Sequence, residues 1–183
     1  MRFITIGYIE RRKGQDVLIN ALESISQEDL AGSEFLLVGQ DSSTMAQELR
    51  ERITEKPWIR MTGTASRAEI HQILSTVDVL VCPSREDPMP TVCAEAMMHH
   101  VPCVISDSVG TAAYISDGVD GIIFKNGDAE GLRKKIVWCI HNKSAVKKMG
   151  NEAYKVFEKV FSVKAFERNL LAYVKDMAGT AGG

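Results

Sequence analysis

Short apolar runs alternate with stretches of helical periodicity along most of this chain. The apolar runs contain few polar positions, which is typical of strands buried on both faces of a parallel sheet. Between the runs, apolar residues recur at three- and four-residue spacing, as in Met45, Leu49 and Ile53. This alternation predicts helices that join six strands, at residues 3–7, 35–38, 59–62, 79–82, 103–105 and 121–124.

After the sixth strand the pattern becomes purely helical, with apolar stripes at Leu132, Ile136, Cys139 and Ile140 and at Val163, Phe166, Leu170, Val174 and Met177. We see no internal repeat and no linker. The expected fold is therefore α/β, a single Rossmann-like domain whose six-stranded parallel sheet has helices on both faces, with a helical C-terminal extension. This domain would span residues 1–177, and residues 178–183, which are small, would form a flexible tail.

The composition and net charge of the chain are typical of a globular domain and give no sign of nucleic-acid binding or of a transmembrane protein. Hydrophobic residues make up 45% and charged residues 25%, and the formal net charge is −2, so nothing attracts the chain generally to nucleic acid. We expect no nucleic-acid partner. No apolar run is long enough to be a transmembrane segment, and the first residues are too short a run for a signal peptide. We therefore expect a cytoplasmic protein.

Cysteines and histidines give little sign of metal chemistry. The four cysteines lie in apolar surroundings without Cys-x-x-Cys spacing, which favours buried, reduced thiols. The adjacent His99 and His100 have no second ligand pair at metal spacing, so we interpret them as helix-end histidines. The expectation is a site without metal.

Ligands of open parallel sheets bind beyond the carboxyl ends of the strands. The loops expected at that edge include residues 8–14, where Arg11, Arg12 and Lys13 precede a helix. A lysine beside a helix N-terminus suits a phosphate, although a solvated basic turn is the alternative. No Gly-x-Gly-x-x-Gly follows the first strand, which argues against a nicotinamide or flavin cofactor.

A second loop at the same edge carries Asp87, and Glu95 follows about one turn inside the next predicted helix. Backbone N–H groups at that helix start would form an anion site. The alternatives are that Asp87 is a turn or capping residue and that Glu95 is a solvent-facing carboxylate.

Four motifs in order resemble the C-terminal domain of family 4 glycosyltransferases, which have the two-lobed GT-B fold. The similarity covers nearly the whole chain. The motifs are Gly7 followed by Lys13-Gly14 and an apolar helix, two acidic residues with seven between them in the segment from Asp87 to Met97, the strand Val101-Pro102-Cys103-Val104, and the turn Asp117-Gly118-Val119-Asp120-Gly121.

The resemblance implies a nucleoside-diphosphate sugar as donor, with a UDP-sugar as the first expectation, no metal requirement and retention of anomeric configuration. Lys13 would neutralise the diphosphate, Glu95 would accept hydrogen bonds from the ribose hydroxyls, and Asp87 would hold hydroxyls of the transferred sugar. Asp87 and Lys13 are thus the expected catalytic residues. The other expected donor-binding residues are Gly7, Arg12, Gly63, Thr64, Glu86, Met89, Pro90, Thr91 and Val92.

Some positions depart from the family pattern. Asp87 replaces the first glutamate, with Glu86 beside it as a substitute, and Pro90 replaces a glycine and removes a backbone donor. Tyr8 stands where an arginine is common, and Ala113 where a later loop has glutamate. Two alternatives therefore stay open: a non-catalytic nucleotide-binding module, or another doubly wound nucleotide-binding domain.

The resemblance also implies an N-terminal lobe that holds the acceptor, whereas this chain has room for one lobe. We therefore expect a donor-binding half that is inactive alone. An apolar strip where the other lobe belongs would favour homodimers of the isolated domain. The full-length protein would be cytoplasmic, with the inner face of a membrane as one option.

Overall fold

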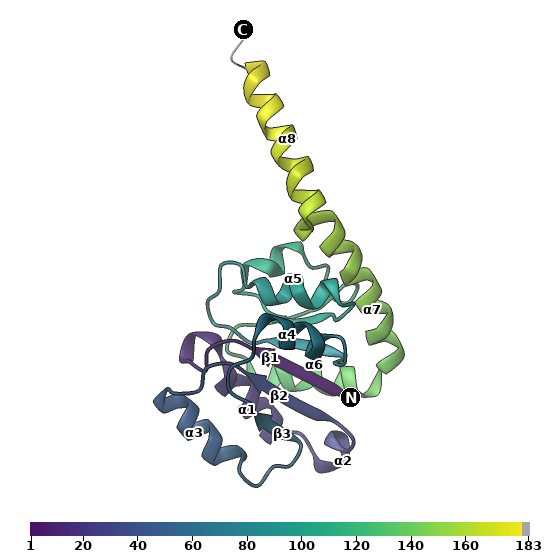
Figure 1. Cartoon of the computed structure of the whole chain (residues 1–183). Coiled ribbons are helices and arrows are strands. Elements are labelled where there is room, and N and C mark those ends of the chain that lie inside the picture. Colours follow the sequence, from purple (N-terminus) through teal and green to yellow (C-terminus); the bar gives the residue numbers. More distant parts are fainter. Residues whose placement is uncertain (181–183) are drawn as a thin grey trace.

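A computed structural model describes residues 1–180 and contains one six-stranded parallel sheet in the order β3-β2-β1-β4-β5-β6 (Figure 1). Each predicted strand is present, with both ends within one residue of the prediction. The order reverses between β1 and β4, and such a switch point is where doubly wound sheets bind ligands. The strands are β1 (Arg2–Ile6), β2 (Glu34–Val38), β3 (Ile59–Met61), β4 (Val79–Cys82), β5 (Cys103–Ser106) and β6 (Ile122–Phe124).

Both faces of the sheet are covered because successive strand residues point to opposite sides. Phe3 of β1 packs in one core cluster with α1 (Gln15–Glu23), α3 (Thr44–Ile53) and α6 (Ala129–His141). Its neighbour Ile4 packs in the other cluster with α4 (Arg67–Leu74) and α5 (Thr91–Met98). All four residues of β4 are buried, as the continuous apolar run predicts.

The remaining helical elements complete the domain. They are α2 (Gln27–Leu30), the 3₁₀ segments η1 (Arg11–Lys13) and η2 (Gly110–Tyr114), and α7 (Lys143–Val156), which a π-helical segment, η3 (Phe157–Phe161), connects to α8 (Val163–Thr180). Helix α7 lies against the body, where Ala153 is buried in the cluster of α5.

Helix α8 is the predicted C-terminal extension, and it projects away from the body (Figure 1). Its apolar stripe forms a helix as predicted but does not join the core, since Phe166 is 65% exposed and Leu170 49%. The helix runs to Thr180 and so overlaps the predicted tail; residues 181–183 of that tail lie outside the described residues.

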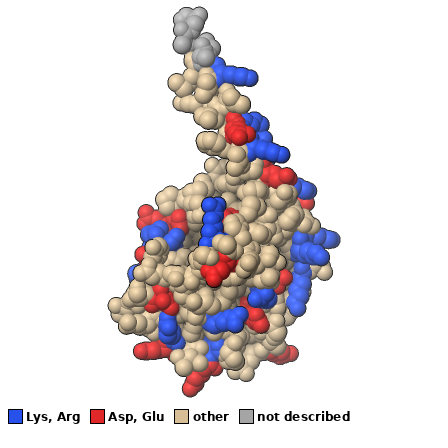
Figure 2. Space-filling view, viewed as in Figure 1, with Lys and Arg blue, Asp and Glu red and all other residues tan. Residues whose placement is uncertain are grey.

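Charges of both signs are interspersed over the visible face of the body and also along α8 (Figure 2). In the part of the chain that the structure describes, no helix combines the length and the apolar character needed to cross a membrane.

Candidate functional site

The loops after β1 and β4 touch each other at the switch point of the sheet. Gly14 has φ +71°, and a Cβ there would lie 2.0 Å from the carbonyl oxygen of Pro83. The backbone N–H of Arg85 donates to the carbonyl of Arg12 at 2.8 Å. This close approach requires glycine at position 14, and it brings the basic turn of η1 beside the loop that carries Asp87.

Lys13 and Asp87 form an ion pair at this junction. The Lys13 ammonium lies 2.5 Å from Oδ2 of Asp87, and the two side chains are 18% and 9% exposed. The carbonyl of Asp87 also accepts from the N–H of Gly110 at 2.9 Å, which fixes its loop against η2. Asp87 is not the cap of α5, whose N-cap residue is Pro90. The capping alternative for Asp87 is therefore wrong, and its side chain pairs with Lys13 instead.

A cleft of about 370 Å³ opens between η1, α4 and α5. Lys13 lies in its wall, together with the first turn of α5, whose leading N–H groups have no acceptor within the helix. Glu95 lies one turn further on, with its side chain 22% exposed. The cleft thus offers a cation, helix N–H groups and a carboxylate acceptor. Its lining residues are Ile6, Gly7, Lys13, Ala65, Arg67, Ile70, Pro90, Thr91, Val92 and Glu95.

Six of the predicted donor-binding residues lie outside the lining of this cleft, namely Arg12, Gly63, Thr64, Glu86, Asp87 and Met89. The Arg12 guanidinium instead donates to Glu10 at 2.9 Å and to the carbonyl of Glu86 at 3.2 Å. Glu86 is exposed, and its side chain does not replace Asp87 beside Lys13. Gly63 and Thr64 precede the lining residue Ala65 without lining the cleft themselves.

A second groove, of about 390 Å³, continues from the cleft along α5. The two share Arg67, Pro90, Thr91 and Glu95. Met89, another predicted site residue, lines this groove and is 46% exposed. The wall opposite α5 is apolar and includes Phe157 and Phe161.

Sequence reasoning missed Arg67, the first residue of α4. Its Nε lies 4.0 Å from Oε1 of Glu95, and its side chain is 83% exposed in the mouth of the cleft. A capping box between Ser66 and Glu69 fixes the backbone at this helix start. The signal available in the sequence was the position of Arg67 directly after the loop of Gly63 and Thr64, two residues that were predicted to bind the donor.

Sequence reasoning also missed Arg85, which lies in the loop that carries Asp87 and contacts η1 and α1. Arg85 donates two hydrogen bonds to the Asp16 carboxylate, at 2.7 and 2.6 Å, and a third to the carbonyl of Arg11. Burial acts to raise the pKa of Asp16, but the hydrogen bonds and charge of Arg85 outweigh it, and the net pKa is lowered. The pair ties the Asp87 loop to α1.

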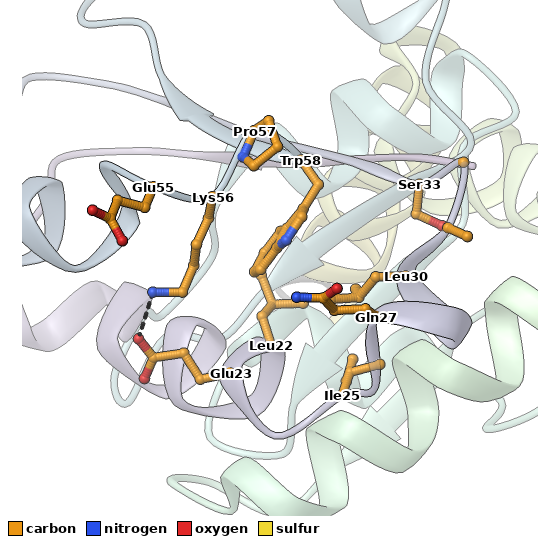
Figure 3. Close-up of a pocket in the computed structure, with 12 residues that line it drawn as sticks. Leu22, Glu23, Ile25, Gln27, Leu30, Ser33, Glu55, Lys56, Pro57 and Trp58 are labelled. Carbon is orange, nitrogen blue, oxygen red and sulfur yellow. Dashed lines mark hydrogen bonds and ion pairs between the residues drawn. The ribbon is translucent and has the colours of Figure 1, made fainter.

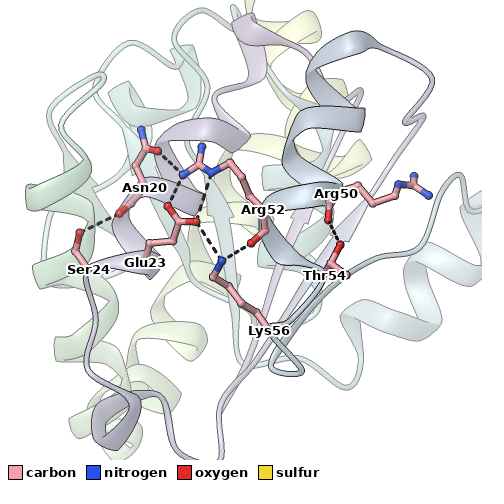
Figure 4. Close-up of polar contacts among 7 residues, drawn as sticks. All are labelled: Asn20, Glu23, Ser24, Arg50, Arg52, Thr54 and Lys56. Carbon is pink, nitrogen blue, oxygen red and sulfur yellow. Dashed lines mark hydrogen bonds and ion pairs between the residues drawn. The ribbon is translucent and has the colours of Figure 1, made fainter.

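The opposite end of the sheet holds a different cavity, of about 440 Å³, where Trp58, Leu30 and Ile25 form apolar walls (Figure 3). Its lysine, Lys56, is paired with Glu23 at 3.2 Å. Figure 4 shows that Glu23 also pairs with Arg52, so the network ties α1 to α3. Ser33 and Trp58 directly precede β2 and β3, so this cavity lies at the amino ends of the strands, away from the switch point at which doubly wound sheets bind ligands.

The prediction of buried, free thiols is confirmed for Cys82, Cys93, Cys103 and Cys139. A neighbouring thiol, Cys93, and burial raise the pKa of Cys82, while burial raises that of Cys139 to about 12. Among residues 1–180, no three or more His, Cys, Asp or Glu side chains are grouped to hold a metal ion.

Comparison with known proteins places these features in a family. Residues 1–142 match the family described as glycosyl transferases group 1. The chain is 26% identical over 157 residues to an uncharacterized glycosyltransferase of Methanocaldococcus jannaschii, an alignment that covers 86% of this chain and 43% of that protein. It thus spans less than half the length of this curated relative.

Solved structures show the same fold. The crystal structure of Anabaena HepE in complex with UDP and glucose superposes with a TM-score of 0.81 at 21% identity, covering 96% of this chain and 48% of that one. The catalytic domain of cholesterol-α-glucosyltransferase from Helicobacter pylori has a TM-score of 0.74 at 21% identity, covering 87% of this chain and 98% of that one.

Proposed function

Because this chain belongs to the glycosyl transferases group 1 family, we propose that it is the donor-binding half of a retaining glycosyltransferase. The observation that carries the proposal is the cleft at the switch point, in which Lys13 and Glu95 lie on either side of the first turn of α5. A nucleoside diphosphate needs a cationic anchor for its phosphates and an acceptor for its ribose hydroxyls, and the lining of this cleft supplies both.

The donor would lie with its diphosphate between Lys13 and the first N–H groups of α5, and with its ribose hydroxyls on Glu95. These positive groups support a site that works without a metal. Structures of Anabaena HepE with UDP, and with UDP-glucose, support a UDP-sugar as the donor class. We therefore propose UDP-sugar over other sugar nucleotides.

Asp87 and Lys13 are the proposed catalytic residues. Asp87 would accept hydrogen bonds from hydroxyls of the transferred sugar and so hold its anomeric carbon in place. When the bond from that carbon to the diphosphate breaks, the electron pair leaves with the phosphate. Lys13 and the α5 dipole then stabilise the developing charge, while the acceptor oxygen bonds to the same face of the sugar and its proton passes to the departing phosphate oxygen.

The acceptor site would lie on a second lobe outside this chain. Two observations support this part of the proposal: the chain spans less than half of the M. jannaschii relative, and α8 exposes an apolar stripe away from the body. On this basis the isolated chain binds donor but does not transfer sugar. Measurable turnover by the purified chain would contradict the half-domain proposal.

A thermal-shift panel with UDP, GDP, ADP and NAD tests donor binding. We expect one nucleoside diphosphate to raise the melting temperature and NAD to leave it unchanged. A preference for NAD would instead favour another class of doubly wound domain. To separate an enzyme from a non-catalytic binding module, the full-length protein must be assayed for hydrolysis or transfer of the sugar nucleotide that binds.

A further inference from the structure

We propose that Arg67 selects the nucleobase of the donor, favouring a base that presents a carbonyl oxygen, uracil or guanine, over adenine. This inference rests on the proposed function, because it concerns the far end of the same cleft. It adds a specificity-determining residue that lies outside the phosphate, ribose and sugar contacts described above.

The order of groups along the cleft points to this role. Lys13 comes from the loop after β1, Glu95 from α5 after β4, and Arg67 from α4 after β3. A nucleoside diphosphate carries its base on the side of the ribose away from the phosphates. With phosphates at Lys13 and ribose hydroxyls at Glu95, the base therefore extends toward the start of α4.

Arg67 is within reach of a base in that position. Its Nε lies 4.0 Å from Oε1 of Glu95, the carboxylate proposed to hold the ribose. The side chain is 83% exposed, whereas the capping box holds the backbone at Ser66 and Glu69. The backbone of Arg67 is therefore held in place, while its guanidinium can change orientation and contact a ligand. Ribose hydroxyls that occupy Glu95 would also weaken the competing contact between Arg67 and this carboxylate.

The chemistry of the guanidinium then decides which base it accepts. Arginine carries five N–H donors and no acceptor. The O4 of uracil and the O6 and N7 of guanine are acceptors, whereas adenine keeps the N7 acceptor but carries an amino group, a donor, where guanine has O6. With adenine, one N–H of Arg67 would therefore face another donor, and a site built to hydrogen-bond a carbonyl oxygen binds a base without that oxygen more weakly.

Titration calorimetry of the purified chain with UDP, GDP, ADP and inorganic pyrophosphate tests the proposal. For Arg67→Ala we expect the Kd of the preferred nucleotide to rise about tenfold. The Kd values of ADP and pyrophosphate should change by less than about twofold. The variant should therefore lose most of the preference for that nucleotide over ADP. Arg67→Lys keeps the charge without the planar fork and should also lose most of the preference.

Arg60→Ala is the matched control, because Arg60 is an exposed arginine of β3 that does not line the cleft. It should change none of the four affinities. Equal weakening of all four ligands by Arg67→Ala would assign Arg67 to the phosphates, and unchanged affinities would remove it from the site. Either result overturns the inference while the proposed function survives. If the unmodified chain binds no nucleoside diphosphate, both fail.

Discussion

The ammonium of Lys13 lies 2.5 Å from a carboxylate oxygen of Asp87, although the two residues are 74 positions apart in the sequence. The pair joins the loop after β1 to the loop after β4. The lysine proposed to bind phosphate and the aspartate proposed to bind the sugar therefore hold each other in place. Breaking it should affect both folding and binding.

Lys13→Ala leaves a mostly buried carboxylate without its partner. We expect the free energy of unfolding to fall by about 1–3 kcal/mol, as measured by urea denaturation. The Kd for UDP should rise about tenfold to a hundredfold, since a charge-assisted contact to phosphate is lost. Arg11→Ala removes an exposed cation of the same turn and should change neither quantity. Equal effects of the two variants would contradict a specific role for Lys13.

The Asp16–Arg85 pair makes stability depend on acid pH. Because the pKa of Asp16 is lowered in the folded state, its contribution is present above the unfolded-state pKa of 3.8 and is lost as pH falls through the lower, folded-state value. Asp16→Asn should therefore cost about 1–2 kcal/mol at pH 7 and much less near pH 3, in urea titrations at both pH values. Glu48→Gln changes an exposed carboxylate of α3 and serves as the control. A cost for Asp16→Asn that is independent of pH would refute this account.

Two glycines have the same backbone conformation but different surroundings, so substituting each one distinguishes the cost of backbone strain from the cost of a steric clash. Gly14 and Gly32 have φ of +71° and +70°, but a Cβ at Gly32 meets nothing within 4 Å. Gly32→Ala should cost about 1–2 kcal/mol, the price of a left-handed residue. Gly14→Ala should cost roughly 3 kcal/mol or more, because its Cβ meets the Pro83 carbonyl. Similar urea midpoints for the two variants would mean that the loops do not touch at Gly14.

The exposed stripe of α8 should make the isolated chain self-associate. We expect light scattering to report a mass above that of a monomer, with the double change Phe166→Glu and Leu170→Glu restoring the monomer mass. Asn169→Glu adds charge at an exposed polar position of the same helix and should leave association intact. A monomeric unmodified chain would show that α8 does not mediate association.

The sheet could be predicted from the sequence because burial on both faces leaves an unmistakable pattern. Val79-Leu80-Val81-Cys82 reads as a continuous apolar run, and all four residues are buried. Topology alone then places Lys13, Asp87 and Glu95 at one edge. The stripe of α8 was also correctly interpreted as helical, but periodicity does not reveal which surface covers an apolar face.

Side-chain contacts inside the site were beyond such reasoning. Arg11, Arg12 and Lys13 are consecutive cations, and only the geometry of η1 turns Lys13 toward the cleft and Arg12 toward Glu10. Arg85 and Asp16 are 69 positions apart in the sequence, so no local sequence pattern predicts that they pair.

The central claim is that a nucleoside diphosphate binds between Lys13 and Glu95, and calorimetric titration of UDP into the unmodified chain and Glu95→Ala tests it most directly. We predict saturable UDP binding to the unmodified chain, with a Kd about tenfold or more higher in Glu95→Ala because the ribose hydroxyls lose their acceptor. Pyrophosphate should bind both proteins equally. No binding of UDP, GDP or ADP, or UDP binding that is unchanged in Glu95→Ala, would contradict the account.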